Sequence, residues 1–359
     1  MTCIHSKSAN AYSFTQNSQI LLKTTAYSIC NMDRIVLGIE STAHTFGIAV
    51  VQGKKVLSNI RDSYSTKKGG MIPYKVAEHH LKVFLDVFNK ALKTANISSE
   101  QIDAIAFSQS PGLGPSLRIG ATFARTLHLL LKKPLIGINH CIAHLEIGRV
   151  LLNAKDPILV YASGANTQII AYDANKYRIF GETLDIGIGN FLDSFGRYAE
   201  LGFPAGPKID ELAKKSNNYI ELPYNVKGMD LVFGGILTNL RQKLKKYKIE
   251  DLCYSAQETV FAMLMEVTER AVAHTGKKEI LLGGGVACNS RLQEMAKTLA
   301  KERGIKCFIL NNEYNIDNAA MIALTGALML QNEITTSFAD SIIKPYERTD
   351  EVVVTWRNE

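Results

Sequence analysis

Two stretches of the chain share one pattern of hydrophobic and polar positions. The first, RIVLGIESTAHTFGIAVVQGKKVLSNIRDS from Arg34, contains three β-rich runs separated by a Ser/Thr turn and by Gly53-Lys54, as expected for a β-meander. At an offset of 122 residues, ILVYASGANTQIIAYDANKYRIFGE carries the same arrangement without a gap, so that Thr45 corresponds to Thr167. The pattern predicts a duplicated fold.

The segments that follow each meander also correspond. IDAIAFSQSPGLGPSLRIGATFARTLHLLL and KEILLGGGVACNSRLQEMAKTLAKERG each read as strand, glycine-bearing turn and helix, and each precedes another strand, PLIGIN or KCFILNN. We therefore predict an α/β protein of two like-folded lobes, each a mixed sheet flanked by helices, with a cleft between them. This plan resembles the actin-like (ASKHA, RNase H-like) superfamily of actin, sugar kinases and chaperone ATPases.

We expect the first lobe at residues 33–155 and the second at 156–345, with a mostly helical insertion at about 186–260 and a tail at 346–359. Residues 1–32 are rich in Ser, Thr, Asn and Gln and contain no acidic residue. We expect a disordered extension there; a targeting segment is the alternative, although organelle transit peptides are normally rich in Arg and this segment has none.

The composition narrows the class of protein further. With 359 residues, 46% hydrophobic and 21% charged, the chain has the composition of a folded protein of about two domains. The chain has 41 Lys and Arg against 34 Asp and Glu. This excess of positive charge favours the binding of polyanions if it is clustered on the surface. The six cysteines form no C-x-x-C, which is typical of a reducing cytosol. No run is apolar enough for a spanning helix, so we expect a cytoplasmic protein, present also in the nucleus if the source is eukaryotic, with no membrane partner.

A pair of histidines gives the sharpest chemical signal. His140 and His144 open a predicted helix directly after PLIGIN, and residues four apart share one face of a helix, so both can bind one metal ion. The corresponding position of the second lobe holds Asp317. It is either the N-cap of its helix or, by the pseudo-symmetry, a third ligand facing the histidines. Two His and one carboxylate suit catalytic iron or zinc. A zincin protease lacks support, because the Glu of H-E-x-x-H is absent.

Three glycine-bearing turns are candidates for contact with phosphate or adenosine, because glycine lets backbone N–H groups close on an anion. They are Ser163–Thr167, Gly202–Pro207 and Gly283–Asn289. A separate run, RQKLKKYK, contains five cations and no acid: Arg241, Lys243, Lys245, Lys246 and Lys248. It is either a solvated helix face or a contact with a nucleic-acid backbone.

An ordered set of motifs resembles one family closely. The set consists of GIESTAHT from Gly38, PGLGPSLRIG from Pro111, the histidine pair, SGANTQ from Ser163, GGGVACNSR from Gly283 and DNAAM from Asp317. These look like the Kae/TsaD family of tRNA threonylcarbamoyladenosine synthases. The AHT turn and the ending RTDEVVVTW resemble the archaeal and eukaryotic branch.

The resemblance implies transfer of a threonylcarbamoyl group from threonylcarbamoyl-AMP to N6 of the adenosine beside the anticodon in tRNAs that read ANN codons. It implies one Fe²⁺ or Zn²⁺ ion on His140, His144, Tyr161 and Asp317. It also implies that threonylcarbamoyl-AMP, or ATP or AMP, is bound by Tyr161, Ala162, Ser163, Gly164, Ala165, Asp193, Gly206, Asp210 and Asn289. Ala165 and Ala205 stand where many members have Gly, which predicts less room for phosphate.

The same resemblance implies partners. Besides tRNA, they are the KEOPS subunits, namely a Bud-type kinase with Pcc-type and Cgi-type subunits, and a Sua/YrdC-type enzyme that supplies the adenylate. Two other functions stay open at this point: a small-molecule kinase or ATPase of the actin-like fold, and an ATP-binding scaffold subunit.

Overall fold

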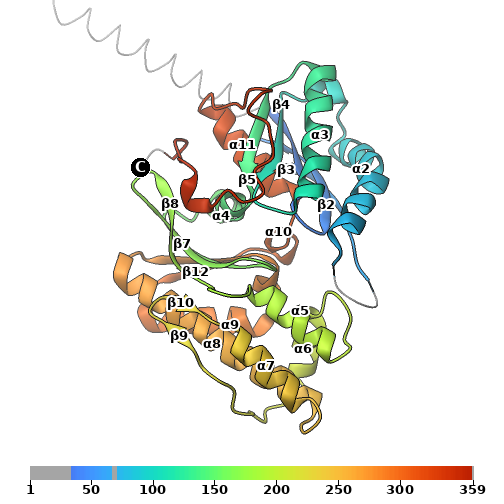
Figure 1. Ribbon diagram of the computed structural model, residues 1–359. Helices are drawn as coiled ribbons and strands as arrows, with labels where there is room; N and C mark the ends of the chain where they lie inside the picture. The colour runs from blue at the N-terminus through green and yellow to red at the C-terminus, as the bar shows by residue number, and fades with distance from the viewer. Residues whose placement is uncertain (1–33, 67–70, 358–359) are drawn as a thin grey trace, which may run out of the picture.

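Two five-stranded mixed sheets form the framework of the protein (Figure 1). The computed structural model describes residues 34–66 and 71–357, so the expectation for residues 1–32 lies outside the described part. The strand orders are β3-β2-β1-β4-β5 and β8-β7-β6-β11-β12, which are the same order twice. In each sheet a three-stranded antiparallel meander continues into two parallel strands. The predicted fold class is confirmed.

The two meanders keep the offset seen in the sequence, because β2 begins at Thr45 and β7 at Thr167. The first sheet contains β1 (Ile35–Glu40), β2 (Thr45–Gln52), β3 (Lys55–Ser63), β4 (Ala104–Ser110) and β5 (Leu135–Asn139). The second contains β6 (Ile158–Ala162), β7 (Thr167–Asp173), β8 (Lys176–Glu182), β11 (Glu279–Gly283) and β12 (Lys306–Ile309).

Helices cover the outer face of each sheet and also fill the space between the two sheets (Figure 1). The first sheet is covered by α2 (Pro73–Ala95) and α3 (Gly114–Leu131). The second is covered by α8 (Ile249–Thr275) and α9 (Ser290–Arg303). Between the sheets lie α4 (His140–Leu152) and α11 (Ala319–Gln331), whose side chains belong to one central core.

These two central helices are exchanged between the halves. Helix α11 follows the last strand of the second sheet but packs on the first: a Cβ added at Gly38 of β1 would lie 2.5 Å from the backbone of Ala319. Helix α4 follows the last strand of the first sheet but packs on the second, where a Cβ added to Gly148 would meet Leu281 at 2.3 Å. At Gly38 the close neighbours are backbone atoms, so the contact leaves room for glycine alone, whereas at Gly148 the end of the Leu281 side chain would have to move to admit a larger residue. The exchange brings both helix starts to the junction of the halves.

The elements between β8 and β11 are mostly helical, as their patterns predict. They are α5 (Ile188–Tyr198), α6 (Gly206–Ala213), the short strands β9 (Val226–Lys227) and β10 (Asp230–Leu231), α7 (Gly234–Lys243) and α8. The basic run is not helical throughout, because α7 ends at Lys243. The amides of Lys246 and Tyr247 donate to the Lys243 carbonyl. Lys248 occupies the N-cap position of α8 without a side-chain hydrogen bond, and the acidic first turn of α8 favours a new helix start there.

The remaining short elements are α10 (Asn312–Asn315) and the 3₁₀ turns Ser99–Gln101, Gly285–Cys288 and Thr349–Glu351. None of the helices in the described ranges combines the length and apolar character that crossing a bilayer requires.

Candidate active site

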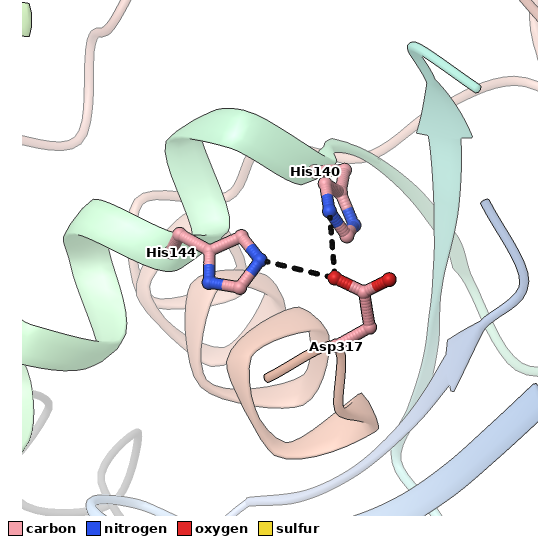
Figure 2. Close-up of side chains that lie close together, drawn as sticks. All are labelled: His140, His144 and Asp317. Carbon is pink, nitrogen blue, oxygen red and sulfur yellow. Dashed lines mark ion pairs between the residues drawn. The ribbon is translucent and has the colours of Figure 1, made fainter. Parts of the chain in front are cut away.

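Two histidines and one aspartate meet where the exchanged helices begin (Figure 2). His140 and His144 lie one turn apart on α4, and Asp317 lies just before α11. Oδ1 of Asp317 is 3.4 Å from Nε2 of His140 and also 3.4 Å from Nε2 of His144. The three candidate ligand atoms lie within 4.8 Å of one another, so this cluster can hold a metal ion.

Two asparagines, and not the candidate ligands, cap the helices. The side chain of Asn139 accepts hydrogen bonds from the amides of Cys141 and Ile142, which begins α4 at His140. The side chain of Asn318 accepts from the amide of Met321 at 3.1 Å and caps α11. The interpretation of Asp317 as the N-cap is therefore wrong. Its carboxylate faces the histidines from outside the helix.

The surroundings of His144 fit a metal ligand. Both of its ring nitrogens are buried and have no hydrogen-bond partner in the described part of the chain, because Nε2 approaches Asp317 without hydrogen-bond geometry. Burial lowers the pKa of His144, which favours the neutral imidazole that binds metals. A buried polar atom with no partner is costly, and coordination through Nε2, the nitrogen that faces Asp317, would remove that cost at one of the two nitrogens.

A buried glutamate that the sequence reasoning missed supports His140. Glu40, at the end of β1, is fully buried, and its Oε2 lies 3.0 Å from Nδ1 of His140. Its Oε1 accepts from the amide of Thr42 at 2.7 Å and from the Thr42 hydroxyl. A carboxylate on the second nitrogen of a ligand histidine fixes the orientation of the ring. The available signal was an acid that ends an otherwise apolar strand.

The charges of the cluster favour a cation. Burial lowers the pKa of His140, but the carboxylates of Glu40 and Asp317 outweigh it and hold that pKa well above its ordinary value. The pKa of Asp317 lies well below its ordinary range because the two imidazoles outweigh its burial. Two carboxylates thus face a pair of imidazoles, and the buried site attracts positive charge.

Tyr161, expected as a fourth ligand, lies on β6 beside His144. The two rings are 5.1 Å apart at their centres and tilted by 43°. The Tyr161 side chain is buried, and burial, with the charges of Cys141 and Asp317, raises the pKa of its phenol well above the ordinary value. The phenol is therefore placed near the cluster and keeps its proton in the absence of a cation.

Of the three glycine turns, two lie against each other. The Ser163–Asn166 turn closes on itself through the Ser163 amide and hydroxyl, which both bond the Asn166 carbonyl. Gly284, at φ +90°, lies so close to this turn that an added Cβ would be 2.4 Å from the Ala162 carbonyl oxygen. Gly164 and Ala165 are exposed at its tip.

The helix N-termini beside these turns differ in whether their first backbone amides are free to bind a ligand. At α5 the amides of Gly189 and Asn190 bond the carbonyls of Ser163 and Gly164, so these donors are used within the protein. At α6 no side chain caps the helix, and a Cβ added to Gly206 would have nothing within 4 Å. The Ala205 methyl is buried towards Gly196, so the methyl expected to narrow this turn is accommodated inside.

Three polar residues expected at the nucleotide make contacts within the second half. Asp193 accepts from the Ala205 amide at 2.8 Å, and burial raises its pKa. Asp210 pairs with Lys214 and lies 3.3 Å from the Ser290 hydroxyl. Asn289 caps α9 through its carbonyl and donates to Gln257 through its amide.

Two cations of the basic run contact other groups of the protein, and three face solvent. Arg241 lies over the ring of Tyr198 at 4.9 Å, and the Lys243 ammonium donates to the Glu221 carbonyl. Lys245, Lys246 and Lys248 are exposed, and no carboxylate of the described residues pairs with them within 4 Å. The run therefore offers three cations to solvent.

The fold and this cluster define an actin-like α/β protein with a histidine–aspartate centre between its halves. The model of the TsaD family, tRNA N6-adenosine threonylcarbamoyltransferase, matches residues 55–324. The chain belongs to this family.

Similar proteins agree with that membership. A tRNA N6-adenosine threonylcarbamoyltransferase from Thermococcus kodakarensis is 54% identical over 324 residues, covering 90% of this chain and 99% of that protein. A probable tRNA N6-adenosine threonylcarbamoyltransferase from Drosophila melanogaster is 46% identical, with 90% of this chain and 99% of that one covered. A probable bifunctional tRNA threonylcarbamoyladenosine biosynthesis protein from Methanosarcina mazei is 50% identical, with 90% of this chain and 60% of that protein covered.

Among solved structures, HypF from T. kodakarensis matches with a TM-score of 0.60 at 15% identity, covering 84% of this chain and 48% of that one. At this identity the likeness concerns the fold alone.

Proposed function

We propose that this protein transfers the threonylcarbamoyl group of threonylcarbamoyl-AMP to N6 of the adenosine next to the anticodon in tRNAs that read ANN codons. Family membership supports the reaction class. The observation that carries the proposal is the convergence of His140, His144 and Asp317 from the two halves beside the turns of the second sheet.

The donor is a mixed anhydride and is already activated, so the protein mainly has to position the amine near the carbonyl and stabilise developing charge. A metal ion held by His140, His144, Asp317 and Tyr161 would supply Lewis-acid stabilisation of oxygen; iron and zinc both suit this set. Glu40 holds the Nδ1 proton of His140 and fixes the ring. Glu40, His140, His144 and Tyr161 are buried, which limits the access of water that would otherwise compete for the donor.

For the adenylate we propose the surface formed by Tyr161, Ala162, Ser163, Gly164 and Ala165 together with Asp193, Gly206, Asp210 and Asn289. Among the starts of α5, α6 and α9, the start of α6 at Gly206 is the most available to a phosphate. The first amides of α5 bond carbonyls of the protein, and α9 is capped by Asn289. The Asn289 and Asp193 side chains stabilise the backbone beside this surface, because Asn289 accepts from the Arg291 amide and Asp193 from the Ala205 amide.

For partners we propose tRNA, bound in part by Lys245, Lys246 and Lys248, a Sua/YrdC-type enzyme that makes the adenylate, and the Bud-type, Pcc-type and Cgi-type KEOPS subunits in the cytoplasm. This chain covers 60% of the bifunctional relative from M. mazei, which therefore contains additional sequence. That additional sequence supports the proposal that this chain acts together with another protein.

A small-molecule kinase of the same fold is the alternative enzyme. It would need Mg²⁺, which prefers oxygen ligands and does not favour two imidazoles. The histidine pair therefore favours the transferase.

Mass spectrometry of nucleosides tests the proposal. Protein, tRNA, threonine, bicarbonate, ATP, the adenylate-forming enzyme and the partner subunits are mixed, and the tRNA is digested. We expect threonylcarbamoyladenosine. Its absence with all partners present would overturn the transferase function, and full activity without the KEOPS subunits would overturn the proposed dependence on them.

A further inference from the structure

The transfer proposed above requires a group that accepts a proton. As N6 of the adenosine attacks the carbamoyl carbon, a C–N bond forms and the bond between that carbon and the phosphate oxygen breaks. AMP leaves with the electron pair of the broken bond, and the attacking amine has to lose one proton. A side chain positioned to accept this proton typically speeds such a step about 10²–10⁴-fold.

The carboxylates near the histidine–aspartate centre make contacts within the protein. Glu40 is fully buried and lies against Nδ1 of His140. Asp193 accepts from the Ala205 amide at 2.8 Å, and Asp210 pairs with a lysine four residues later. These contacts stabilise the structure around the centre. A side chain without such contacts is the better candidate for proton transfer.

His44 is an imidazole without such contacts. It lies in the turn between β1 and β2 and is partly exposed. Within residues 34–66 and 71–357, the hydrogen bonds and ion pairs of histidine side chains involve other histidines and leave both ring nitrogens of His44 without a partner. A neutral imidazole has one nitrogen that accepts a proton. Because solvent reaches this ring, a bound substrate can reach it as well.

The turn that carries His44 begins at the metal centre. Glu40, at the end of β1, bonds His140, and the Thr42 hydroxyl lies 3.2 Å from Nδ1 of the same imidazole. On the other side of the turn, the Tyr64 amide donates to the His44 carbonyl at 2.9 Å. The backbone of His44 is therefore held in place beside the candidate ligands.

The ring of His44 meets the second half of the protein. It lies edge-on to the ring of Phe203, with centres 5.9 Å apart and planes at 81°, and Phe203 shortly precedes the start of α6 at Gly206. Burial raises the pKa of Asp193 on α5, and the charge of His44 opposes that rise. From α2, the imidazole of His80 also interacts with His44. His44 thus lies between the metal centre and the surface proposed for the adenylate.

We propose that His44 is a catalytic residue that accepts the proton of the attacking amine. Its neutral ring takes the proton from N6 as the C–N bond forms, while the electron pair of the breaking C–O bond leaves with AMP. The proton then passes from the imidazolium to water. This role rests on the proposed function.

Chemical rescue tests the assignment. Single-turnover transfer to tRNA is measured with all partner subunits present, for the wild type, His44→Ala and His274→Ala, at rising concentrations of imidazole. We expect His44→Ala to lose about 10²–10⁴-fold in rate and to regain part of it with imidazole, more strongly with more basic substituted imidazoles. Its metal content and its affinity for AMP should match those of the wild type. His274, an exposed histidine on α8, is the control and should respond to neither change.

Two further variants separate proton transfer from other roles. His44→Gln keeps an N–H donor but cannot accept the proton, so it should be as slow as His44→Ala. His44→Arg keeps a positive charge that could hold a phosphate but does not act as a base, so it should be slow as well. An active His44→Arg protein, a wild-type rate in His44→Ala, or no rescue by any imidazole would overturn the assignment while the wild type still forms threonylcarbamoyladenosine. Absence of product from the wild type would instead overturn the proposed function, and this role with it.

Discussion

Glu40 and His140 form a buried pair in which Oε2 of the glutamate lies 3.0 Å from Nδ1 of the imidazole. The glutamate comes from β1 of the first sheet, and the histidine begins the helix that packs on the second. The pair joins the first sheet to the candidate metal centre, so a change at Glu40 should affect metal binding.

Glu40→Gln should weaken metal binding without unfolding the protein. The amide keeps the size of the side chain but removes the charge that orients His140, and loss of such a partner typically costs about 10–100-fold in metal affinity. Titration of the metal-depleted protein with Zn²⁺ measures this change, with Thr126→Val, an exposed position on α3, as the control. Equal affinities for wild type and Glu40→Gln would mean that the pair is not a support for the metal centre.

Asp317→Asn and His140→Ala should each remove bound metal and abolish transfer, since either leaves an incomplete ligand set. The neighbouring Asn318→Ala makes a matched comparison, because Asn318 caps α11 and also donates to the Ile316 carbonyl at 2.8 Å. It should lower the free energy of unfolding by about 1–2 kcal/mol and keep its metal. Elemental analysis and chemical denaturation check both. Metal and turnover retained in Asp317→Asn would refute the inter-sheet centre.

The free energy of unfolding should decrease as the pH falls, because His80 is buried in the folded protein. Burial and the nearby His79 and His44 lower its pKa from 6.5 to about 4, against smaller opposing effects of the Ala43 carbonyl, to which its Nε2 bonds, and of Asp62. The unfolded chain therefore binds the proton more readily. The contribution is complete above about pH 6.5 and is lost as the pH falls towards 4.

Between pH 7 and pH 5 this loss amounts to about 2 kcal/mol. His80→Gln keeps an N–H donor but does not titrate, so its free energy of unfolding should decline less over the same range. Denaturant titrations at the two pH values measure the difference. Parallel declines in both proteins would show that His80 is not responsible.

Gly38→Ala should destabilise the contact between α11 and the first sheet. The new methyl would lie 2.5 Å from backbone atoms of Ala319 and Ala323, and overpacking of this kind costs about 1–3 kcal/mol. Gly235→Ala on α7 has nothing within 4 Å and should be neutral or stabilising by about 0.5–1 kcal/mol. Thermal melting compares the two. A Gly38→Ala protein as stable as the wild type would contradict the close packing described here.

The duplicated framework was predictable because alternation and turn residues are local signals, and the offset between the meanders survives in the positions of β2 and β7. The meeting of Asp317 with the histidines was also predictable, since it follows from the pseudo-symmetry. Glu40 was not, because its role depends on a partner 100 residues away. The end of α7 at Lys243 was not predictable either, because lysines and leucine favour a helix throughout the basic run.

The exchange of α4 and α11 has a consequence for synthesis. Chains are made from the N-terminus, and the apolar inner face of the first sheet, with Val36, Ala49 and Ala106, is covered by a helix that begins only at Ala319. Until that helix leaves the ribosome, the first half exposes a surface prone to aggregation. The same helix brings Asp317, so the ligand set is completed only after almost all of the chain has been made.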